Sequence, residues 1–477
     1  MQSGQHGMMR RRLALLGLIV ALGFTALLAT GQPKSTEAKP PEAISKPFET
    51  PAERGLRFLT DKPYLTPDFD QEVFDRLYTV WPLELRKQAE KLTPAERRKI
   101  AFARYGLDEH PTAPRGTALQ YAPAPNGGWV MNCLACHTGR VAGKVILGAP
   151  NTTYALQTLT EEVRAVKYEM GKPLAHMDRG SLAFPLGGSN GTTNAVMFGQ
   201  ILLTYRDPDL TFRKDRVLPL LQHHDVDAIA WWHYKKKSRL YVDGFAPKSP
   251  RALMQFLLIP RNGPDKFAEW ESDYRDVDAW LTSIEAPKYP FPIDHKLALR
   301  GEVIFNKNCA DCHGTYGSQG KWPERIVPID VVATDPVRLE ALTVAGRQKY
   351  EASWFCDLGR QTTIDDPQGY VAPPLDGIWA SAPYLHNGSV PTLADLFDSK
   401  TRPIVWHRPN VDDYDQARVG LAVERLTELP RAAKDDPREA RRYFDTRLNG
   451  KSAAGHTFPD ALNAEEKRAV IEYLKTL

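Results

Sequence analysis

Cysteine is scarce in this chain. Only five of the 477 residues are cysteine, and four of them stand in two closely spaced pairs, so a network of disulfides is not what holds the fold together. The fifth, Cys356, lies in Trp354-Phe355-Cys356-Asp357, beside aromatic residues and without a neighbouring base. We expect it to be a small buried side chain rather than a reactive thiol.

A large excess of one charge is also lacking. The formal net charge is +4, but Arg10, Arg11 and Arg12 lie in the first 31 residues, which contain no acid. The remaining 59 basic and 58 acidic side chains give a net charge of +1. Binding to nucleic acid normally requires a clear basic surface, so nucleic acid is not an expected partner.

The first 31 residues have the pattern of an export signal. Three arginines precede the uncharged run Leu13–Ala29, which is the order of a positive n-region and an apolar h-region. The run approaches the ~20 residues that span a bilayer, so residues 1–31 are predicted to be a signal peptide or an N-terminal membrane anchor. No cysteine follows the run, which excludes a lipoprotein anchor. We expect a periplasmic or extracellular protein, with residues 13–29 as a candidate tether to the inner membrane.

Two short motifs carry the strongest chemical signal. Cys133-Leu134-Ala135-Cys136-His137 and Cys309-Ala310-Asp311-Cys312-His313 both have the form CxxCH. Two thiols at this spacing bond to the two vinyl groups of one haem, and the following histidine lies under the iron as its proximal ligand. A zinc half-site is the alternative for one such motif. Two motifs in a chain with an export signal favour two covalently bound haem c groups.

Residues that alternate between polar and apolar are rare, so helices should dominate. Thr93-Pro94-Ala95-Glu96 and Asn463-Ala464-Glu465-Glu466 are capping boxes, which predict one helix through Ala103 and an amphipathic helix at the C-terminus. A further helix is expected over Arg300–Phe305, just before Cys309.

The Pro-rich segments set the expected domain boundaries. Residues 32–50 are rich in Pro, Lys and Glu and are predicted to be a linker, and the stretch 287–292 separates the two motifs. We therefore predict a mainly α fold with two cytochrome c-like haem domains, residues 51–290 and 291–477, that contain long irregular loops.

The second axial position decides whether each haem carries electrons or reacts, because an occupied position gives a carrier and an open one a reaction site. For the second haem, His386 and His456 both follow the motif in sequence. We favour His456 as the distal ligand, with His386 as the alternative.

The first haem has no obvious second ligand nearby. Residues 138–175 contain no histidine and one methionine, Met170. We therefore predict that this haem is open. His176 and Met177 are the nearest alternatives, and a ligand from either would make it a six-coordinate carrier.

The segment Ala372–Leu393 contains Ala382-Pro383-Tyr384-Leu385-His386-Asn387-Gly388, which is similar to the Ala-Pro-Tyr-x-His-x-Gly signature of the bacterial di-haem cytochrome c peroxidase superfamily. Within it the chain looks most like the rubber oxygenase branch, which Tyr289–Asp294 and Gly455-His456 also resemble. The resemblance covers roughly residues 115–477 and is clearest in the second half.

The resemblance implies different roles for the two haems. The N-terminal haem would react with oxygen or peroxide, and the C-terminal haem would be a six-coordinate electron relay. In the rubber oxygenase branch the relay haem has two histidine ligands, which supports His456 opposite His313. Gln255 matches a distal-side glutamine of the peroxidases, and Asp265 falls near their catalytic glutamate, so both are candidate catalytic residues. For Asp265 a surface loop position is the alternative.

The chain also departs from the peroxidases. Val242, in Tyr241-Val242-Asp243-Gly244, stands where they carry a tryptophan between the haems. Trp231 or Trp232 could take its place, although paired tryptophans more often belong to a core. The superfamily commonly holds a calcium ion between its domains, which this chain could share, but no acidic loop with regular ligand spacing is visible.

These observations lead to one main functional hypothesis and two alternatives. The main hypothesis is an exported di-haem oxidoreductase that reacts with H2O2 or O2 at the haem of His137 and relays electrons through the haem of His313. A peroxidase would need a redox partner such as a small cytochrome or a cupredoxin. The alternatives are a non-catalytic electron-transfer cytochrome and a sensory or scaffold protein tethered by residues 13–29.

Overall fold

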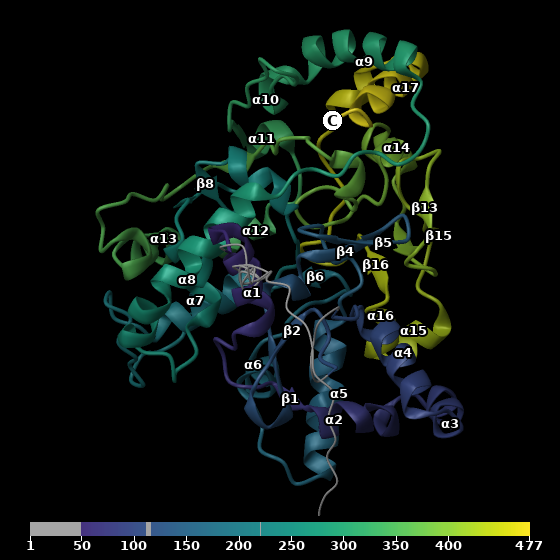
Figure 1. Ribbon diagram of the computed structural model, residues 1–477. Helices are drawn as coiled ribbons and strands as arrows, with labels where there is room; N and C mark the ends of the chain where they lie inside the picture. Colours follow the sequence, from purple (N-terminus) through teal and green to yellow (C-terminus); the bar gives the residue numbers. More distant parts are fainter. Residues whose placement is uncertain (1–48, 111–115, 220) are drawn as a thin grey trace, which may run out of the picture. The chain divides into compact units, whose positions relative to one another are not determined.

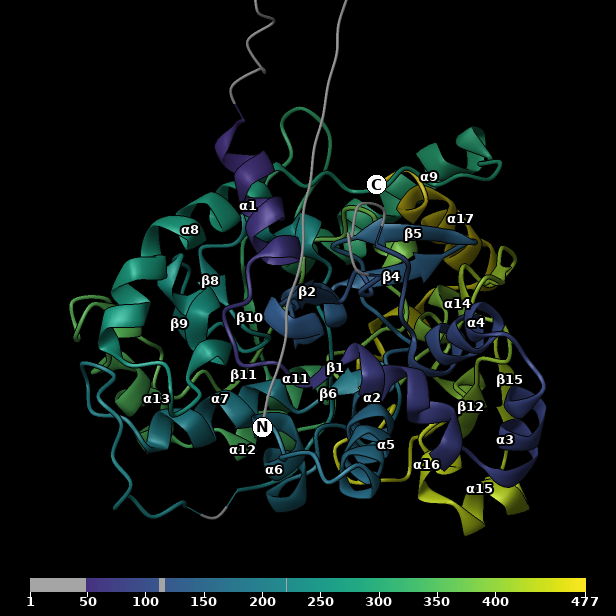
Figure 2. The ribbon, with the colours of Figure 1, turned by 60° about the horizontal axis from the view of Figure 1, so that its bottom comes forward.

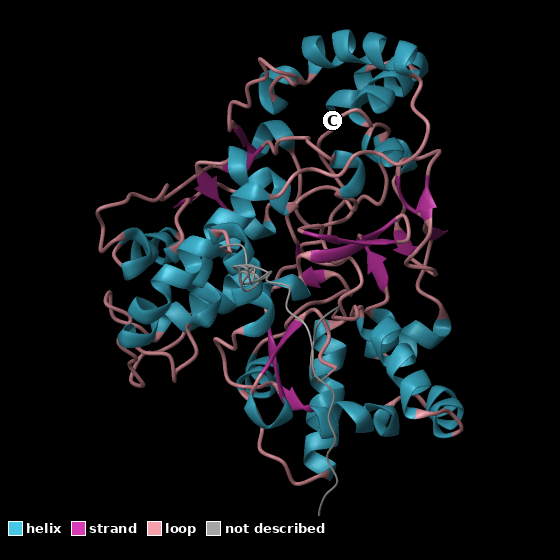
Figure 3. Ribbon diagram, viewed as in Figure 1, coloured by secondary structure: helices cyan, strands magenta, loops and turns pink. Residues whose placement is uncertain are grey.

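Helices dominate the described backbone (Figures 1 and 3). A computed structural model describes residues 49–110, 116–219 and 221–477, so the predicted leader and nearly all of the predicted linker lie outside the described residues. The α-helices are α1 Pro51–Asp61, α2 Gln71–Arg76, α3 Leu83–Glu90, α4 Pro94–Tyr105, α5 Leu156–Glu169, α6 His176–Ala183, α7 Ala195–Thr204, α8 Pro264–Ser283, α9 His295–Asn308, α10 Ala310–His313, α11 Ile329–Val332, α12 Val337–Ala341, α13 Val344–Glu351, α14 Leu393–Leu396, α15 Arg431–Asp435, α16 Pro437–Ala440 and α17 Ala464–Leu474.

The β-strands of the described chain are short, as the scarcity of alternating residues predicts. They form two three-stranded antiparallel sheets, in the orders β1-β3-β2 and β15-β12-β16, and several two-stranded pairs. The strands are β1 Phe69–Asp70, β2 Tyr121–Pro123, β3 Gly128–Met131, β4 Thr138–Val141, β5 Lys144–Leu147, β6 Thr192–Thr193, β7 Val226–Asp227, β8 Arg239–Leu240, β9 Ala246–Pro247, β10 Ile326–Pro328, β11 Gly369–Val371, β12 Val405–His407, β13 Tyr414–Asp415, β14 Gly420–Leu421, β15 Glu424–Leu426 and β16 Tyr443–Asp445.

Both predicted capping boxes are confirmed. The Thr93 side chain accepts a hydrogen bond from the Glu96 backbone while Glu96 accepts one from the Thr93 backbone, and α4 begins at Pro94. Asn463 and Glu466 make the same exchange at the start of α17. The first of these helices runs two residues past the predicted end, to the left-handed Gly106.

The pair α9 and α17 positions the second CxxCH motif. These helices pack closely because Gly301 has no side chain: a Cβ atom there would lie 1.9 Å from the carbonyl oxygen of Ala469. The shared face buries Phe305 and Val470. The helix predicted over Arg300–Phe305 is thus part of a longer α9, which delivers Cys309 directly after its last residue.

Residues inside the first motif help to form two of the three hydrophobic cores. Leu134 is fully buried in the core that contains Phe267, whereas the adjacent Ala135 belongs to the core around Trp129. Cys356 is fully buried in the first of these cores, which confirms the prediction made for it. The backbone of the first motif is therefore fixed from two sides by apolar packing.

Segments far apart in sequence join the two halves of the described chain. Arg441, just after α16, forms an ion pair with Glu161 of α5, and Lys451 pairs with Asp225 next to β7. Figures 1 and 2 both show α16 beside α5. The contacts group Glu49–Leu477 into one unit, and the division at residue 290 stays a prediction. Within the described ranges no helix is both long and apolar enough to cross a membrane.

The buried Arg206 ties the end of α7 to the loop before α8. It is 1% exposed and donates hydrogen bonds of 2.5–2.8 Å to four backbone carbonyls, those of Leu210, Leu258, Ile259 and Asn262. We predict that Arg206→Met lowers the free energy of unfolding by about 3 kcal/mol or more, because each buried carbonyl left unpaired costs ~1–3 kcal/mol. Urea denaturation followed by circular dichroism measures the change.

Arg213→Met is the matched control. This arginine pairs with Asp207 at an exposed position, where an ion pair contributes little. Equal shifts of the unfolding midpoint in the two variants would contradict the assignment of Arg206 as a structural centre.

Candidate functional site

The first CxxCH motif forms a tight turn between β3 and β4. The motif starts with a short 3₁₀-helix, Cys133–Ala135. Asn132 caps its N-terminus, because its side chain accepts a hydrogen bond from the backbone of Leu134 at 2.9 Å. The backbone N–H of His137 then bonds to the carbonyl of Cys133 at 3.2 Å. This turn gathers the two thiols and the imidazole in one small segment.

His137 is held in a single orientation from outside the motif. Its Nδ1 lies 3.1 Å from the carbonyl oxygen of Ile229, and its ring stacks on Trp231 with 4.2 Å between ring centres. A carbonyl only accepts hydrogen bonds, so Nδ1 carries the proton. Burial lowers the pKa of His137 to about 4, which keeps the ring neutral. The Nε2 lone pair is therefore free for a metal, as in a proximal haem ligand.

The second motif repeats this arrangement with different elements. The motif starts at the end of α9 and continues into α10, where the His313 backbone N–H bonds to the carbonyl of Cys309 at 3.0 Å. Nδ1 of His313 lies 2.9 Å from the carbonyl of Pro373. Burial lowers its pKa as well. The residues of both motifs thus fit the demands of a c-type haem.

His456 lies close to His313. Their ring centres are 6.1 Å apart with 66° between the ring planes. Two imidazoles on opposite sides of one metal, each at about 2.0–2.1 Å, have ring centres about 6 Å apart. His456 has a positive φ of 44°, and its backbone N–H bonds to the Val332 carbonyl at 2.7 Å. Burial, with His313 nearby, lowers its pKa to about 3. The pair fits a haem with two histidine ligands.

The other candidate, His386, occupies different surroundings. Its ring stacks on Tyr370 at 4.2 Å, and its backbone carbonyl accepts a hydrogen bond from Asp227. Burial lowers the pKa of His386 to about 3, and the positive charge of Arg338 adds to this effect. Of the two histidines, only His456 makes a ring contact with His313 in the described chain.

Trp231 and Trp232 connect the surroundings of the two motifs. Trp231 stacks on His137, whereas Trp232 is 1% exposed and donates from Nε1 to the carbonyl of Asp376 at 2.7 Å. Asp376 follows Pro373, the acceptor for His313, by three residues. The core role expected of paired tryptophans holds for Trp232, and the pair reaches from His137 to the backbone three residues after Pro373.

The two candidate catalytic residues differ in burial and in their surroundings. Gln255, in the 3₁₀-helix Arg251–Leu257, is fully buried and accepts a hydrogen bond from the hydroxyl of Tyr241. Its Nε2 has no partner among the described residues. Asp265 is exposed in the first turn of α8, where an acid interacts favourably with the helix dipole. The structure gives Gln255 a buried polar setting and Asp265 the alternative surface position.

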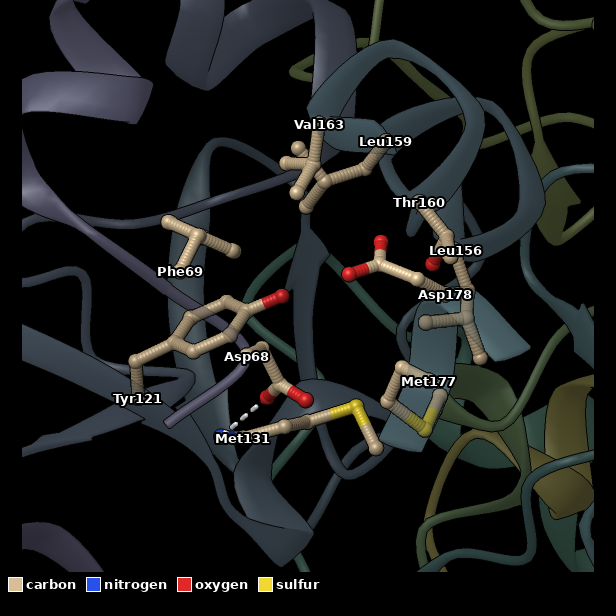
Figure 4. Close-up of a pocket in the computed structure, with 10 residues that line it drawn as sticks. All are labelled: Asp68, Phe69, Tyr121, Met131, Leu156, Leu159, Thr160, Val163, Met177 and Asp178. Atoms are coloured by element: carbon tan, nitrogen blue, oxygen red, sulfur yellow. Dashed lines mark hydrogen bonds between the residues drawn. The ribbon is translucent and has the colours of Figure 1, made fainter. Parts of the chain in front are cut away.

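His176 and Met177 start α6, and Met177 lines a small pocket (Figure 4). Met177 and Met131 both line it, and His176 Nε2 lies 3.6 Å from Asp68, another lining residue. The pocket also contains Phe69, Tyr121, Leu156, Leu159, Thr160, Val163 and Asp178. Burial raises the pKa of Asp68. The described structure shows His176 in contact with Asp68 and Thr66 and not with the ring of His137.

A buried cationic cluster lies around Asp243. Arg338 and Arg347, 1% and 3% exposed at their side chains, both pair with this carboxylate, which is fully buried. Arg347 also donates to two backbone carbonyls, whereas the two hydrogen bonds of Arg338 to Asp243 are 3.4 and 3.5 Å long. Two guanidinium groups therefore share one carboxylate.

Residues 369–407 match a family described as RoxA-like, cytochrome c-like. This stretch contains Pro373, Asp376 and His386, which contact the surroundings of both CxxCH motifs. A cytochrome c-like segment implies covalently bound haem c, and it suggests a haem cytochrome oxidoreductase of the kind that includes the rubber oxygenase-like branch.

Two curated relatives are similar to part of the chain. The uncharacterized protein y4iJ of Sinorhizobium fredii is 30% identical over 265 residues, which cover 41% of this chain and 42% of the relative. The uncharacterized protein y4iM of the same organism is 30% identical over 239 residues, covering 42% and 53%. The chain thus spans about half the length of the curated relatives it matches.

Side chains for a separate metal ion are not grouped in the described ranges. No set of three or more His, Cys, Asp or Glu residues there is arranged to hold one. The calcium ion that the resemblance allows therefore gains no support from side-chain ligands.

Sequence reasoning missed the contacts that orient the site. The acceptors for His137 and His313 are the backbone carbonyls of Ile229 and Pro373, and a carbonyl leaves no signal in the residue type. Arg338 stands in no motif, and Asp243 belongs only to the segment around Val242. A clue was available in Asp243 alone, since an acid within an apolar stretch requires a partner when buried.

We predict that Asp243→Asn strongly destabilises the protein, because it leaves the two buried guanidinium groups without a counter-charge. Removing one partner of a buried ion pair typically costs about 3–5 kcal/mol. The free energy of unfolding from guanidinium chloride titration tests this. Asp357→Asn, at a partly exposed ion pair with Arg251, is the control and should change it far less.

Proposed function

We propose that this protein is an exported di-haem c-type cytochrome oxidoreductase. Cys133, Cys136 and His137 would hold a haem that reacts with H2O2 or O2, and Cys309, Cys312 and His313 would hold an electron-relay haem. The observation that carries the proposal is the unequal setting of the two proximal histidines. A second histidine, His456, lies 6.1 Å from the ring of His313, whereas Trp231 is the ring partner of His137 within the described chain.

The chain's own residues would hold and tune the two groups. Bound haem would supply the redox-active iron and the axial position at which an oxidant binds. The carbonyls of Ile229 and Pro373 keep Nδ1 protonated on His137 and His313, so that each ring presents Nε2. The Tyr241 hydroxyl donates to the amide oxygen of Gln255, whose Nε2 has no partner in the described chain. In this proposal that Nε2 would be the donor to a bound oxidant.

Trp231 and Trp232 support the relay part of the proposal. In this chain the position of the peroxidase tryptophan is Val242, whose carbonyl accepts a hydrogen bond from Val371. The tryptophan pair instead joins the ring of His137 to the backbone beside Pro373. We infer that this pair takes the place of the missing tryptophan between the haems.

Location and partners follow from the same proposal. The arginines and apolar run of residues 1–31 support export to the periplasm or the cell exterior, with or without a tether through residues 13–29. If peroxide is the oxidant, a small cytochrome or a cupredoxin would deliver electrons. A calcium ion remains part of the proposal only through the resemblance.

Carbon monoxide distinguishes an open haem from a six-coordinate one. We expect the fully reduced protein to bind about one CO per two haems, because only an iron with a free axial position binds CO. Optical titration gives the stoichiometry, and a pyridine haemochrome assay gives the haem content.

Absence of CO binding would refute the enzyme and favour the electron-transfer cytochrome. If CO binds, separate assays with H2O2 plus a reduced cytochrome and with polyisoprene plus O2 divide peroxidase from oxygenase. Turnover in neither assay would favour a sensory or scaffold role.

The distal ligand of the second haem is tested by two substitutions. We expect His456→Ala to convert one haem from low-spin to high-spin with haem content unchanged, because the imidazole is lost while the thioethers remain. His386→Ala should leave the spin states unchanged. Electron paramagnetic resonance of the oxidised protein reports both. The opposite pattern would assign the ligand to His386.

A further inference from the structure

Arg338 is the least satisfied charged side chain of the buried cluster. A guanidinium group has five N–H donors, and those of Arg338 make two hydrogen bonds in the described chain, both at the long limit for such bonds. Its Nε has no partner there. Its side chain is 1% exposed, so bulk solvent does not reach these donors.

The charge around Arg338 is also unbalanced. Arg347 competes for the same carboxylate and holds it at the shorter distance, 3.0 Å. The positive charge of Arg338 acts on two nearby histidines, His224 and His386, and both have an Nε2 atom without a partner among the described residues. A buried cation that shares its one counter-charge and lies near ring nitrogens without partners is costly, and a further anionic acceptor would lower that cost.

We propose that Arg338 anchors a buried carboxylate-binding site, with His386 as a second donor. Two sources supply this chemistry: a propionate group of bound haem and a soluble carboxylate. A carboxylate accepts paired hydrogen bonds from a guanidinium group in a fork geometry. Both Nη atoms of Arg338 face Asp243, so the fork left for a second carboxylate is that of the unpartnered Nε–H with a remaining Nη–H. Arg347, which has other acceptors, is the structural partner of Asp243.

The location favours a haem propionate, and this part of the inference rests on the proposed function. The backbone carbonyl of His386 accepts a hydrogen bond from the backbone N–H of Asp227, a residue near enough to Cys136 of the first motif to affect the pKa of that thiol. On the other side, Tyr370 stacks on His386, and the charge of Arg338 acts on the pKa of its hydroxyl. Tyr370 is three residues before Pro373. The site therefore lies between the surroundings of the two attachment motifs.

The test uses the full-length haem-loaded protein and its Arg338→Gln variant. The pH dependence of the haem midpoint potentials, measured by spectroelectrochemistry, reports the ionisation of a propionate. A cation in contact lowers a carboxyl pKa by about 1–3 units, so Arg338→Gln should raise the pH of the transition at one haem by that amount. The groups facing Arg338 that also titrate or carry charge are Asp243, Arg347, His224, His386, Tyr241 and Tyr370.

Arg347→Gln is the matched control. It removes an equally buried guanidinium group from the same carboxylate, so it reproduces any general effect of disturbing Asp243. It should leave the transition in place. Arg338→Lys retains the charge without the fork and should give a smaller shift than Arg338→Gln. If circular dichroism shows that Arg338→Gln does not fold, Arg338→Lys replaces it as the test variant.

A soluble carboxylate is tested in parallel. Sodium acetate, against sodium chloride at equal ionic strength, should raise the thermal unfolding midpoint of the wild type and not of Arg338→Gln if a soluble carboxylate is the occupant. This measurement also works on protein without haem. If the purified protein contains no haem, that result refutes the proposed function, whereas the acetate measurement still tests the anion site. Equal pH transitions in the two glutamine variants together with no acetate effect would overturn the inference.

Discussion

Two backbone carbonyls from distant segments set the orientation of the whole site. The Ile229 carbonyl fixes the ring of His137 and the Pro373 carbonyl fixes that of His313, in each case through Nδ1. A carbonyl is held in place only by the fold, so the surrounding elements have to be correctly packed before either imidazole presents Nε2. The positions of these two contacts therefore depend on the short strands, the loops and the hydrophobic cores of both halves.

The same dependence explains why the halves of the chain interlock. A pair of independent cytochrome domains would each supply all of its own contacts. Here ion pairs between α5 and Arg441 and between Asp225 and Lys451 fasten the C-terminal segments to the N-terminal elements. The buried charges of Asp243, Arg338 and Arg347 lie where such segments meet. Asp243 belongs to the N-terminal half and both arginines to the C-terminal half, so these ion pairs also depend on the two halves being packed together.

How much the sequence predicts depends on the range of the interaction. The caps at Thr93 and Asn463 are local, and the helices that they predict are present, because the residues that satisfy the first N–H groups stand three positions apart. The burial of Cys356 also follows from its immediate neighbours. The two CxxCH motifs are chemically complete within five residues each, so the haem c that they indicate needs no knowledge of the fold.

Long-range contacts were harder to predict. His456 was favoured because it follows the second motif and was supported by the resemblance, and its ring lies near His313. Gln255 came from the resemblance alone and occupies a buried polar setting. The resemblance also suggested Asp265, which lies in the first turn of α8 and is exposed to solvent. Spacing along the chain does not reveal whether such an acid points inward or into solvent. The stack of Trp231 on His137 depends on residues 94 positions apart, for which no local pattern exists.

The 3₁₀-helix Trp231–Lys236 limits how this chain can change in length. Successive residues in such a helix differ by about 120° in direction, at three residues per turn. Trp231 faces His137 and Trp232 faces Asp376, so inserting one residue between them would turn one of the two away from its partner. Related chains should therefore vary in length at exposed loops and keep an unbroken Trp231-Trp232 step.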